Sequence, residues 1–254
     1  MKAFILAAGK GTRLGYLTKD KPKGMLELNG DTILKHQINL FRSVGIDEIV
    51  VIRGYKKNKI NYPNIRYIDN DKYDTTNMVE SLMCAEKYLD GDCIVTYADL
   101  LFEKNVITNL LSIKESITVT VDSLWKEYWM KRYGSINIDN ENLIVNDDKI
   151  IQIGQSADDI TNIHYRYVGI NKFDEKGINE LLKIYNIKKK HKKDWSASGN
   201  DFYNGYLTDI LQELIDCNIP LHCNIIKGGW LEIDTIKDYD LAIELIKTKH
   251  IILE

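Results

Sequence analysis

A short glycine turn follows the first apolar run of the chain. The run ends at Ala8, and Gly9 and Gly11 come next, separated by one residue. Because glycine has no side chain, such a turn exposes backbone N–H groups that can bind phosphate oxygens. Arg13 and Lys23 add positive charge shortly afterwards. These residue types at this spacing predict a polyphosphate site.

The spacing of the turn separates it from two well-known nucleotide motifs. A dinucleotide fingerprint requires Gly-x-Gly-x-x-Gly, but Leu14 stands at the third glycine position and Gly15 comes one residue late. A Walker A loop requires Gly-x-x-x-x-Gly-Lys followed by Ser or Thr, which residues 9–12 do not match. Neither motif is matched, and both are set aside. A turn that only joins a strand to a helix stays open for the glycine pair taken alone.

An aspartate follows a second apolar run. Residues 93–96 predict a buried strand, and Asp99 comes just after it. Ligands of α/β proteins bind outside the carboxyl ends of the strands, so a carboxylate there can hold Mg²⁺ against phosphate oxygens. The alternative is a cap for the turn that follows.

These residues require a sheet whose strands end at one common edge. Asp31 and Thr32 begin a predicted helix, and residues 48–52 form the next strand. A strand, loop, helix and strand in this order predict a parallel pair with a right-handed crossover. Further strands are predicted at residues 65–68, 117–121, 135–138, 143–145, 150–153 and 167–170, and a helix within residues 201–219.

The pattern Leu6-Ala7-Ala8-Gly9-x-Gly11-Thr12-Arg13-Leu14, followed by Pro22-Lys23, is far more specific than the glycine pair. It resembles the nucleotidyltransferase family that activates sugar phosphates and small phosphate esters. The resemblance implies that Arg13, Lys23 and Asp99 act in catalysis. The segment Glu232-Ile233-Asp234-Thr235 resembles the motif that supplies the family's second metal ligand, which is Asp234 here; a place beside a Thr235 to Asp238 capping box is the alternative. The implied nucleotide contacts are Leu6, Ala8, Gly9, Lys10, Gly11, Thr12 and Ala98.

Asn77 and Ser81 stand four residues apart and therefore share one face of a predicted helix near its start. A helix cap and a solvated serine explain them equally simply. The segment from Asp71 to Leu82 resembles, however, the part of phosphocholine cytidylyltransferases that holds the pyrimidine. An amide both donates and accepts hydrogen bonds, which suits a cytosine edge. We expect both residues to contact the base.

The acceptor site is expected in the middle of the chain. Residues 125–133 are rich in aromatic and basic side chains, and clustered cations are difficult to bury. A carboxylate on the acceptor would require such cations, although core packing explains the tryptophans as well. Tyr206 and Asp209 fall near the acceptor contacts of related cytidylyltransferases. The expected acceptor contacts are Lys126, Trp129, Lys131, Arg132, Tyr206 and Asp209.

The fold class implied is α/β and nucleotide-diphospho-sugar-transferase-like, with a mixed, mainly parallel sheet flanked by helices and a small antiparallel acceptor lobe. We expect one domain over residues 1–254, with a nucleotide-binding part near residues 1–115 and 228–254 and the lobe near residues 116–227.

The activity implied is a Mg²⁺-dependent transfer of CMP from CTP to a small phosphorylated acceptor. Phosphoglutamine is the expected acceptor, giving CDP-glutamine for capsule modification; phosphocholine, phosphoethanolamine, aminoethylphosphonate and sugar 1-phosphates are the alternatives.

Composition excludes several other classes. The net charge is −3, which gives no sign of a nucleic-acid groove or an anionic membrane surface. The apolar runs are too short to span a membrane, so a cytoplasmic protein is expected, and a homodimer is compatible with the sequence. A dehydrogenase and a non-catalytic nucleotide-sensing module are the remaining alternatives, and neither explains both carboxylates together with Lys23.

Overall fold

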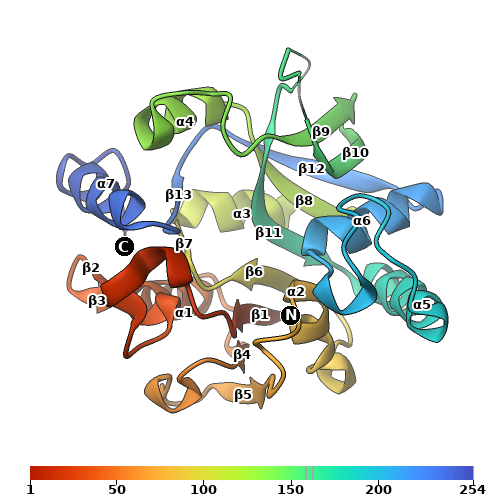
Figure 1. Cartoon of the computed structure of the whole chain (residues 1–254), viewed down its shortest axis with the longest axis horizontal. Helices are drawn as coiled ribbons and strands as arrows, with labels where there is room; N and C mark the ends of the chain where they lie inside the picture. The colour runs from red at the N-terminus through yellow and green to blue at the C-terminus, as the bar shows by residue number, and fades with distance from the viewer. Residues whose placement is uncertain (158, 162, 254) are drawn as a thin grey trace.

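A mixed sheet forms the centre of the molecule (Figure 1). The computed structural model describes residues 1–157, 159–161 and 163–253. Within them the main sheet has nine strands in the order β5-β4-β1-β6-β11-β8-β12-β10-β9. Its strands are β1 (Lys2–Ala7), β4 (Glu48–Arg53), β5 (Arg66–Asp69), β6 (Cys93–Tyr97), β8 (Ile117–Asp122), β9 (Glu141–Asn146), β10 (Lys149–Ser156), β11 (Arg166–Phe173) and β12 (Leu221–Ile226). Two short antiparallel pairs join β2 (Glu27–Leu28) to β3 (Asp31–Thr32) and β7 (Leu100–Phe102) to β13 (Trp230–Glu232).

The pairing of the central strands brings several segments to one edge. β1 runs parallel to β4 and β6, and Leu6 pairs with Tyr97, so the loops after β1 and β6 leave the sheet side by side. β11 runs antiparallel between β6 and β8. Its first residue, Arg166, pairs with Asp122 at the carboxyl end of β8. The antiparallel strand therefore presents its amino end at the edge where its neighbours present their carboxyl ends.

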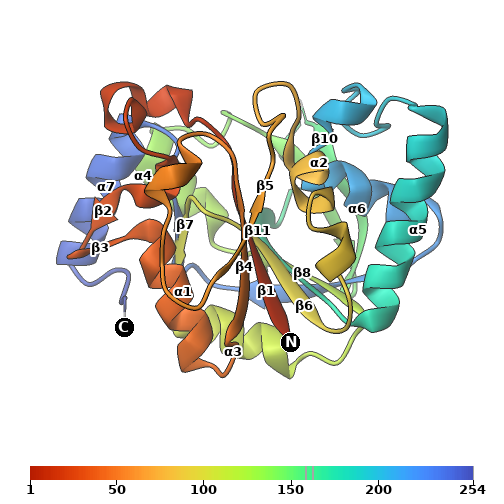
Figure 2. The same ribbon diagram turned by 90° about the horizontal axis from the view of Figure 1, so that it is seen from below.

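Helices cover both faces of the sheet, as Figure 2 shows. Buried side chains of α1, α3 and α4 form one hydrophobic cluster, and those of α2, α5 and α6 form another across the sheet. α7 packs in a third cluster with the turn that contains Leu14. The helices are α1 (Ile33–Ser43), α2 (Met78–Met83), α3 (Lys104–Ser112), α4 (Trp125–Tyr133), α5 (Glu175–His191), α6 (Leu207–Asp216) and α7 (Ile236–Lys247).

One predicted strand is absent from the described structure. Residues 136–138 form bends, and residue 135 is not part of a strand. Gly134 and Asp139 on either side have positive φ angles of 69° and 54°, which break an extended path. The carbonyl of Ile138 accepts a hydrogen bond from the indole N–H of Trp129 (2.9 Å) instead of from a neighbouring strand.

The fold class agrees with the sequence, although Asp31 and Thr32, expected at the start of a helix, form β3, and α1 begins at Ile33. The α/β class and the mixed sheet with helices on both faces are confirmed, and β9 and β10 extend the sheet in antiparallel fashion. The strands of the expected lobe continue the same sheet, because β11 and β8 follow β6 directly. Among the described helices, none combines the length and the hydropathy of a membrane span.

Candidate active site

The glycine turn opens into a cavity of about 270 Å³ at the end of β1. Gly11 has a φ of 63°, a conformation that glycine adopts without strain, and its carbonyl accepts a hydrogen bond from Thr18 Oγ1 (2.8 Å). The hydrogen bonds of the described residues do not use the amide N–H groups of residues 9–12. The turn is thus held in shape while its N–H groups stay free for an anion. Of the expected nucleotide contacts, the cavity is lined by Leu6, Ala8, Gly9, Gly11, Thr12 and Ala98.

Lys10 is the one expected contact of the turn that does not line this cavity. Its ammonium lies 5.6 Å from the ring centre of Tyr73, which is itself part of the cavity wall.

Lys23 lies between two aspartates from opposite ends of the chain. Its ammonium is 2.7 Å from Asp99 Oδ2 and 2.5 Å from Asp234 Oδ1. Burial alone would lower the pKa of Lys23, but the two carboxylates outweigh it and the pKa is raised. Arg13 also reaches Asp234, at 3.0 Å, and keeps an exposed side chain. The site therefore holds two permanent positive charges beside the free amides of the turn.

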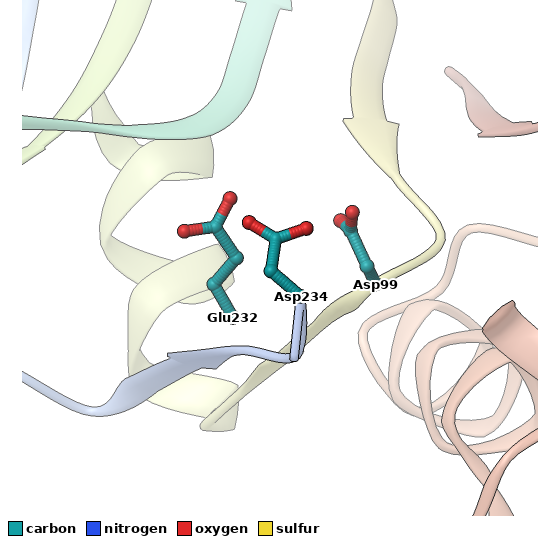
Figure 3. Close-up of side chains that lie close together, drawn as sticks. All are labelled: Asp99, Glu232 and Asp234. Carbon is teal, nitrogen blue, oxygen red and sulfur yellow. The ribbon is translucent and has the colours of Figure 1, made fainter. Parts of the chain in front are cut away.

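A third carboxylate completes this cluster, and the sequence did not single it out. Asp99, Asp234 and Glu232 each offer one oxygen, and these oxygens lie within 4.8 Å of one another (Figure 3). Burial raises the pKa of Glu232 to about 7; the nearby Asp234 adds to this rise and Arg132 opposes it. Burial acts in the same direction on the pKa of Asp234, yet Lys23, Arg13 and Arg132 lower it to about 2.

The donor set fits Mg²⁺, which prefers carboxylate oxygens. Asp99 Oδ1 is buried and has no hydrogen-bond partner among the described residues, so it is free to bind a ligand. Glu232 is the last residue of β13, and Asp234 follows two residues later. Alternate residues of an extended chain point to the same side, so this spacing is the signal that would have identified Glu232 as a third carboxylate of the site.

Arg132 is placed differently from the expectation. Its side chain is fully buried, and its guanidinium pairs with Glu232, with Asp234 (3.2 Å) and with Asp238 (2.7 Å). Its three ion-pair partners are all carboxylates, and the rings of Trp129 and Tyr133 lie 5.5 and 4.9 Å away. Arg132 therefore orients the acidic cluster from α4 and is not exposed to an acceptor.

Asn77 and Ser81 lie on the wall of the same cavity as the glycine turn. Asn77 is the N-cap of α2, and its Oδ1 accepts a hydrogen bond from the N–H of Met78 (3.0 Å). Ser81 is buried and accepts a hydrogen bond from Asn70 (3.0 Å), so it is not a solvated serine. The backbone N–H of Asn77 donates to the carbonyl of Tyr203 (3.0 Å), whereas its side-chain Nδ2 makes no hydrogen bond within the described part of the chain. Both capping and base recognition are therefore compatible with its position.

A second cavity, of about 450 Å³, adjoins the first, and Arg13, Met78 and Tyr97 line both. Tyr206 lines it, as expected for an acceptor contact. Its other charged wall residues were not found from the sequence: Asp139, Glu141, Arg166 and Glu232. The walls come from β9, β11 and the start of α6, which lie far apart in the chain.

The remaining expected acceptor contacts do not line this cavity. Trp129 is fully buried and packs against Trp125, so its ring belongs to the core. Lys126 has its ammonium 5.6 Å from the ring centre of Trp125, and Lys131 is exposed beside a separate hollow near α7. α4 is held by its buried tryptophans, and this orientation turns both lysines away.

Asp209 is a helix cap. It is 1% exposed, and its oxygens accept hydrogen bonds from the N–H groups of Ser198 (2.9 Å) and Tyr206 (2.8 Å) and from the hydroxyl of Ser198 (2.9 Å). Asp209 is thus the N3 residue of the capping box whose N-cap is Tyr206, and these contacts, at the start of α6, differ from the expected contact with the acceptor.

Comparisons with known proteins agree with this geometry. Residues 3–126 match the MobA-like NTP transferase domain. The chain is 34% identical to the CTP:phosphoglutamine cytidylyltransferase of Campylobacter jejuni over 96% of this chain and 100% of that protein. It is 25% identical to the choline-phosphate cytidylyltransferase of Streptococcus pneumoniae over 98% of this chain and 100% of that protein.

Solved structures share the fold. The structure of the CTP:phosphocholine cytidylyltransferase from Streptococcus pneumoniae superposes with a TM-score of 0.78 at 23% identity, covering 96% of this chain and 98% of that one. The inositol-1-phosphate CTP transferase from T. maritima gives 0.71 at 21% identity, covering 95% and 94%.

Proposed function

The chain belongs to the nucleotidyltransferase family, and we propose that it transfers CMP from CTP to a small phosphorylated acceptor, phosphoglutamine, with release of pyrophosphate. The observation that carries this proposal is Lys23 between Asp99 and Asp234 at the mouth of the glycine turn. This arrangement lies where the two cavities meet, as Arg13 lines both.

The chemistry needs no side-chain nucleophile. The phosphoryl oxygens of the acceptor are anionic near neutral pH, as they are in a phosphate monoester, whose second pKa is about 6, so one of them attacks without a general base. The new bond joins this oxygen to the α-phosphorus of CTP, and the bond from the α-phosphorus to the bridging oxygen breaks as pyrophosphate leaves. The obstacle is repulsion between two anions in an in-line displacement.

The positive and hydrogen-bond-donating groups of the site would reduce this repulsion. The free amides of the turn bind phosphate oxygens, and Lys23 keeps its proton because its pKa is raised. Arg13 is placed to bind phosphate oxygens of both substrates. Asp99, Asp234 and Glu232 would hold Mg²⁺, which when bound neutralises charge on the triphosphate. Asn77 and Ser81, which line the same cavity, would contact the base.

The acceptor is supported by two observations. The relative with 34% identity over nearly the whole chain is named for phosphoglutamine. Two basic side chains, Arg13 and Arg166, and three carboxylates line the second cavity, which suits the carboxylate and the ammonium of an amino acid.

Phosphocholine is the second candidate, because a specific observation favours it. The rings of Tyr97, Tyr167, Tyr206 and Trp230 line the acceptor cavity, and aromatic faces attract a quaternary ammonium.

A pyrophosphate-release panel tests the proposal. It crosses CTP, UTP, ATP and GTP with phosphoglutamine, phosphocholine, phosphoethanolamine, aminoethylphosphonate and glucose 1-phosphate, with Mg²⁺ or with excess EDTA. The expected result is Mg²⁺-dependent turnover that is fastest with CTP and phosphoglutamine. Turnover with another nucleotide, or none with any pair, contradicts the cytidylyltransferase assignment. A higher kcat/KM for phosphocholine than for phosphoglutamine would leave the cytidylyltransferase assignment intact and change only the proposed acceptor.

A further inference from the structure

The acceptor cavity contains a single basic side chain that is not already engaged at the nucleotide end. Among the described residues that line it, only Arg13 and Arg166 are basic, and Arg13 pairs with Asp234. Arg166 begins β11, and its side chain is 11% exposed. A substrate carboxylate in this cavity therefore has Arg166 as its available partner.

The structure holds the guanidinium of Arg166 in a fixed direction. It lies over the ring of Trp129, 4.6 Å from the ring centre, and Nη1 donates a hydrogen bond to the carbonyl of Asp139 (2.7 Å). Nη2 lies 3.3 Å from the carboxylate of Asp139, a long contact to a side chain that is 58% exposed. A guanidinium has five N–H donors, so donors remain for a ligand. An exposed carboxylate in a long contact is also easily replaced by another carboxylate.

The same cavity contains a sheltered acid. Glu141 lines it, and Thr208 donates a hydrogen bond to Glu141 Oε1 at 3.2 Å. Burial raises the pKa of Glu141 and the charge of Arg166 opposes this rise. An ammonium group brought into the cavity would offset the cost of burying this carboxylate.

We propose that Arg166 binds the α-carboxylate of the acceptor and that Glu141 binds its α-ammonium, so this pair selects a phosphorylated amino acid over phosphocholine. The inference rests on the proposed function, because it names how that site recognises its acceptor. A planar guanidinium matches a carboxylate with two parallel hydrogen bonds. The carboxylate of Asp139 stands where the ligand carboxylate would bind.

Rejection of the competing acceptor follows from the same residues. Phosphocholine has no carboxylate, so Arg166 would keep only its long contact with the carboxylate of Asp139 while a second cation entered the cavity. Two like charges with one weak ion pair between them are costly, and selectivity often depends on such a penalty. The aromatic rings of the cavity then contact the apolar part of the acceptor in either case.

The experiment removes one charge from the protein and the matching charge from the substrate. The variants are Arg166→Met, Arg166→Lys and Glu141→Gln. The matched control is Lys126→Met, which removes a cation outside the cavity. The acceptors are phosphoglutamine, its analogue without the α-carboxylate, its analogue without the α-amino group, and phosphocholine.

We expect Arg166→Met to lower kcat/KM for phosphoglutamine by about 100-fold, the effect of losing one charged hydrogen-bonding partner. The loss for the analogue without the carboxylate should stay within about threefold. Glu141→Gln should show the mirror-image pattern, with its smallest loss for the analogue without the amino group. Arg166→Lys, which keeps the charge and is the variant least disturbing to the fold, should retain an intermediate preference. Lys126→Met should match the wild-type chain.

Each outcome separates the two proposals. Equal losses on every acceptor in all three variants, with melting temperatures near that of the wild-type chain, overturn the roles of Arg166 and Glu141 and leave the proposed activity intact. A wild-type chain that turns over no acceptor with CTP overturns the proposed function itself. Loss of discrimination confined to the matching substrate group supports the inference.

Discussion

The nucleotide side and the acceptor side of the site are built in different ways. The nucleotide side is formed by loops that leave adjacent parallel strands, so residues close to a motif in sequence are also close to the ligand cavity. The acceptor side takes its walls from β9, β11 and the start of α6, and no short segment supplies more than a part of it. Local sequence motifs therefore specify the nucleotide side, whereas the pairing of distant strands assembles the acceptor side.

α4 illustrates the difference. Its sequence carries the cations expected for an acceptor site, yet two buried tryptophans set its orientation. Arg132 then faces the acidic cluster on the nucleotide side, and Lys126 and Lys131 do not line the acceptor cavity. A basic residue can suit a ligand and still not contact it, because the burial of other side chains decides which way its helix faces.

The largest effect is expected where the two sides meet. Asp234 pairs with Lys23, Arg13 and Arg132. Asp234→Asn keeps the volume but removes the charge that holds all three, so kcat should fall by about 1,000-fold, at the upper end for one electrostatic group of an active site. Single-turnover pyrophosphate release measures the loss, with circular dichroism to verify the fold. Near-normal turnover at limiting Mg²⁺ would exclude Asp234 from the site.

The next prediction tests whether Arg132 belongs to the nucleotide side. Arg132→Met leaves Glu232, Asp234 and Asp238 without their shared cation, a change that costs about 3–5 kcal/mol. The melting temperature should fall by about 10 °C, and the apparent affinity for Mg²⁺ should change. Lys131→Met, the exposed neighbour on the same helix, is the control and should alter neither. If the Arg132 variant changes only the preference among acceptors, Arg132 contacts the acceptor as the sequence predicted.

A smaller effect is expected at the base wall. Asn77→Asp keeps the helix cap, because aspartate caps as well as asparagine does, but it removes the amide N–H donors. The ratio of kcat/KM for CTP to that for UTP should fall by about tenfold, the value of one or two hydrogen bonds, while the melting temperature stays the same. If Asn77→Ala lowers stability and neither variant changes the nucleotide preference, the residue is only a cap.

The smallest effect on acceptor choice is expected at Asp209. Asp209→Ala removes the cap that accepts hydrogen bonds from Tyr206 and Ser198, which costs about 1–2 kcal/mol of unfolding free energy. The ratio of kcat/KM for phosphoglutamine to that for phosphocholine should stay within about twofold of the wild-type value. A selective loss with phosphoglutamine would show instead that this buried carboxylate reaches the ammonium.

Much of the fold was predictable, because its signals are local. The apolar runs predicted the parallel strands. Asp31-Thr32 predicted the start of a helix, and α1 begins one residue later, at Ile33, with Thr32 as its N-cap. The strand expected at residues 135–138 failed because two residues with positive φ angles and the indole of Trp129 compete for that segment. A short apolar run carries no information about such a distant partner.

The sequence by itself determined the nucleotidyltransferase family and the glycine turn, since both follow from residues within one short stretch. It also indicated Lys23, Asp99 and Asp234 through their motifs. Only the tertiary structure added Glu232 to the carboxylates, turned Arg132 toward them and brought Arg166 and Glu141 into one cavity. The physical reason is that strand pairing and core burial decide which distant residues meet, and neither leaves a periodic signal around the residues that they bring together.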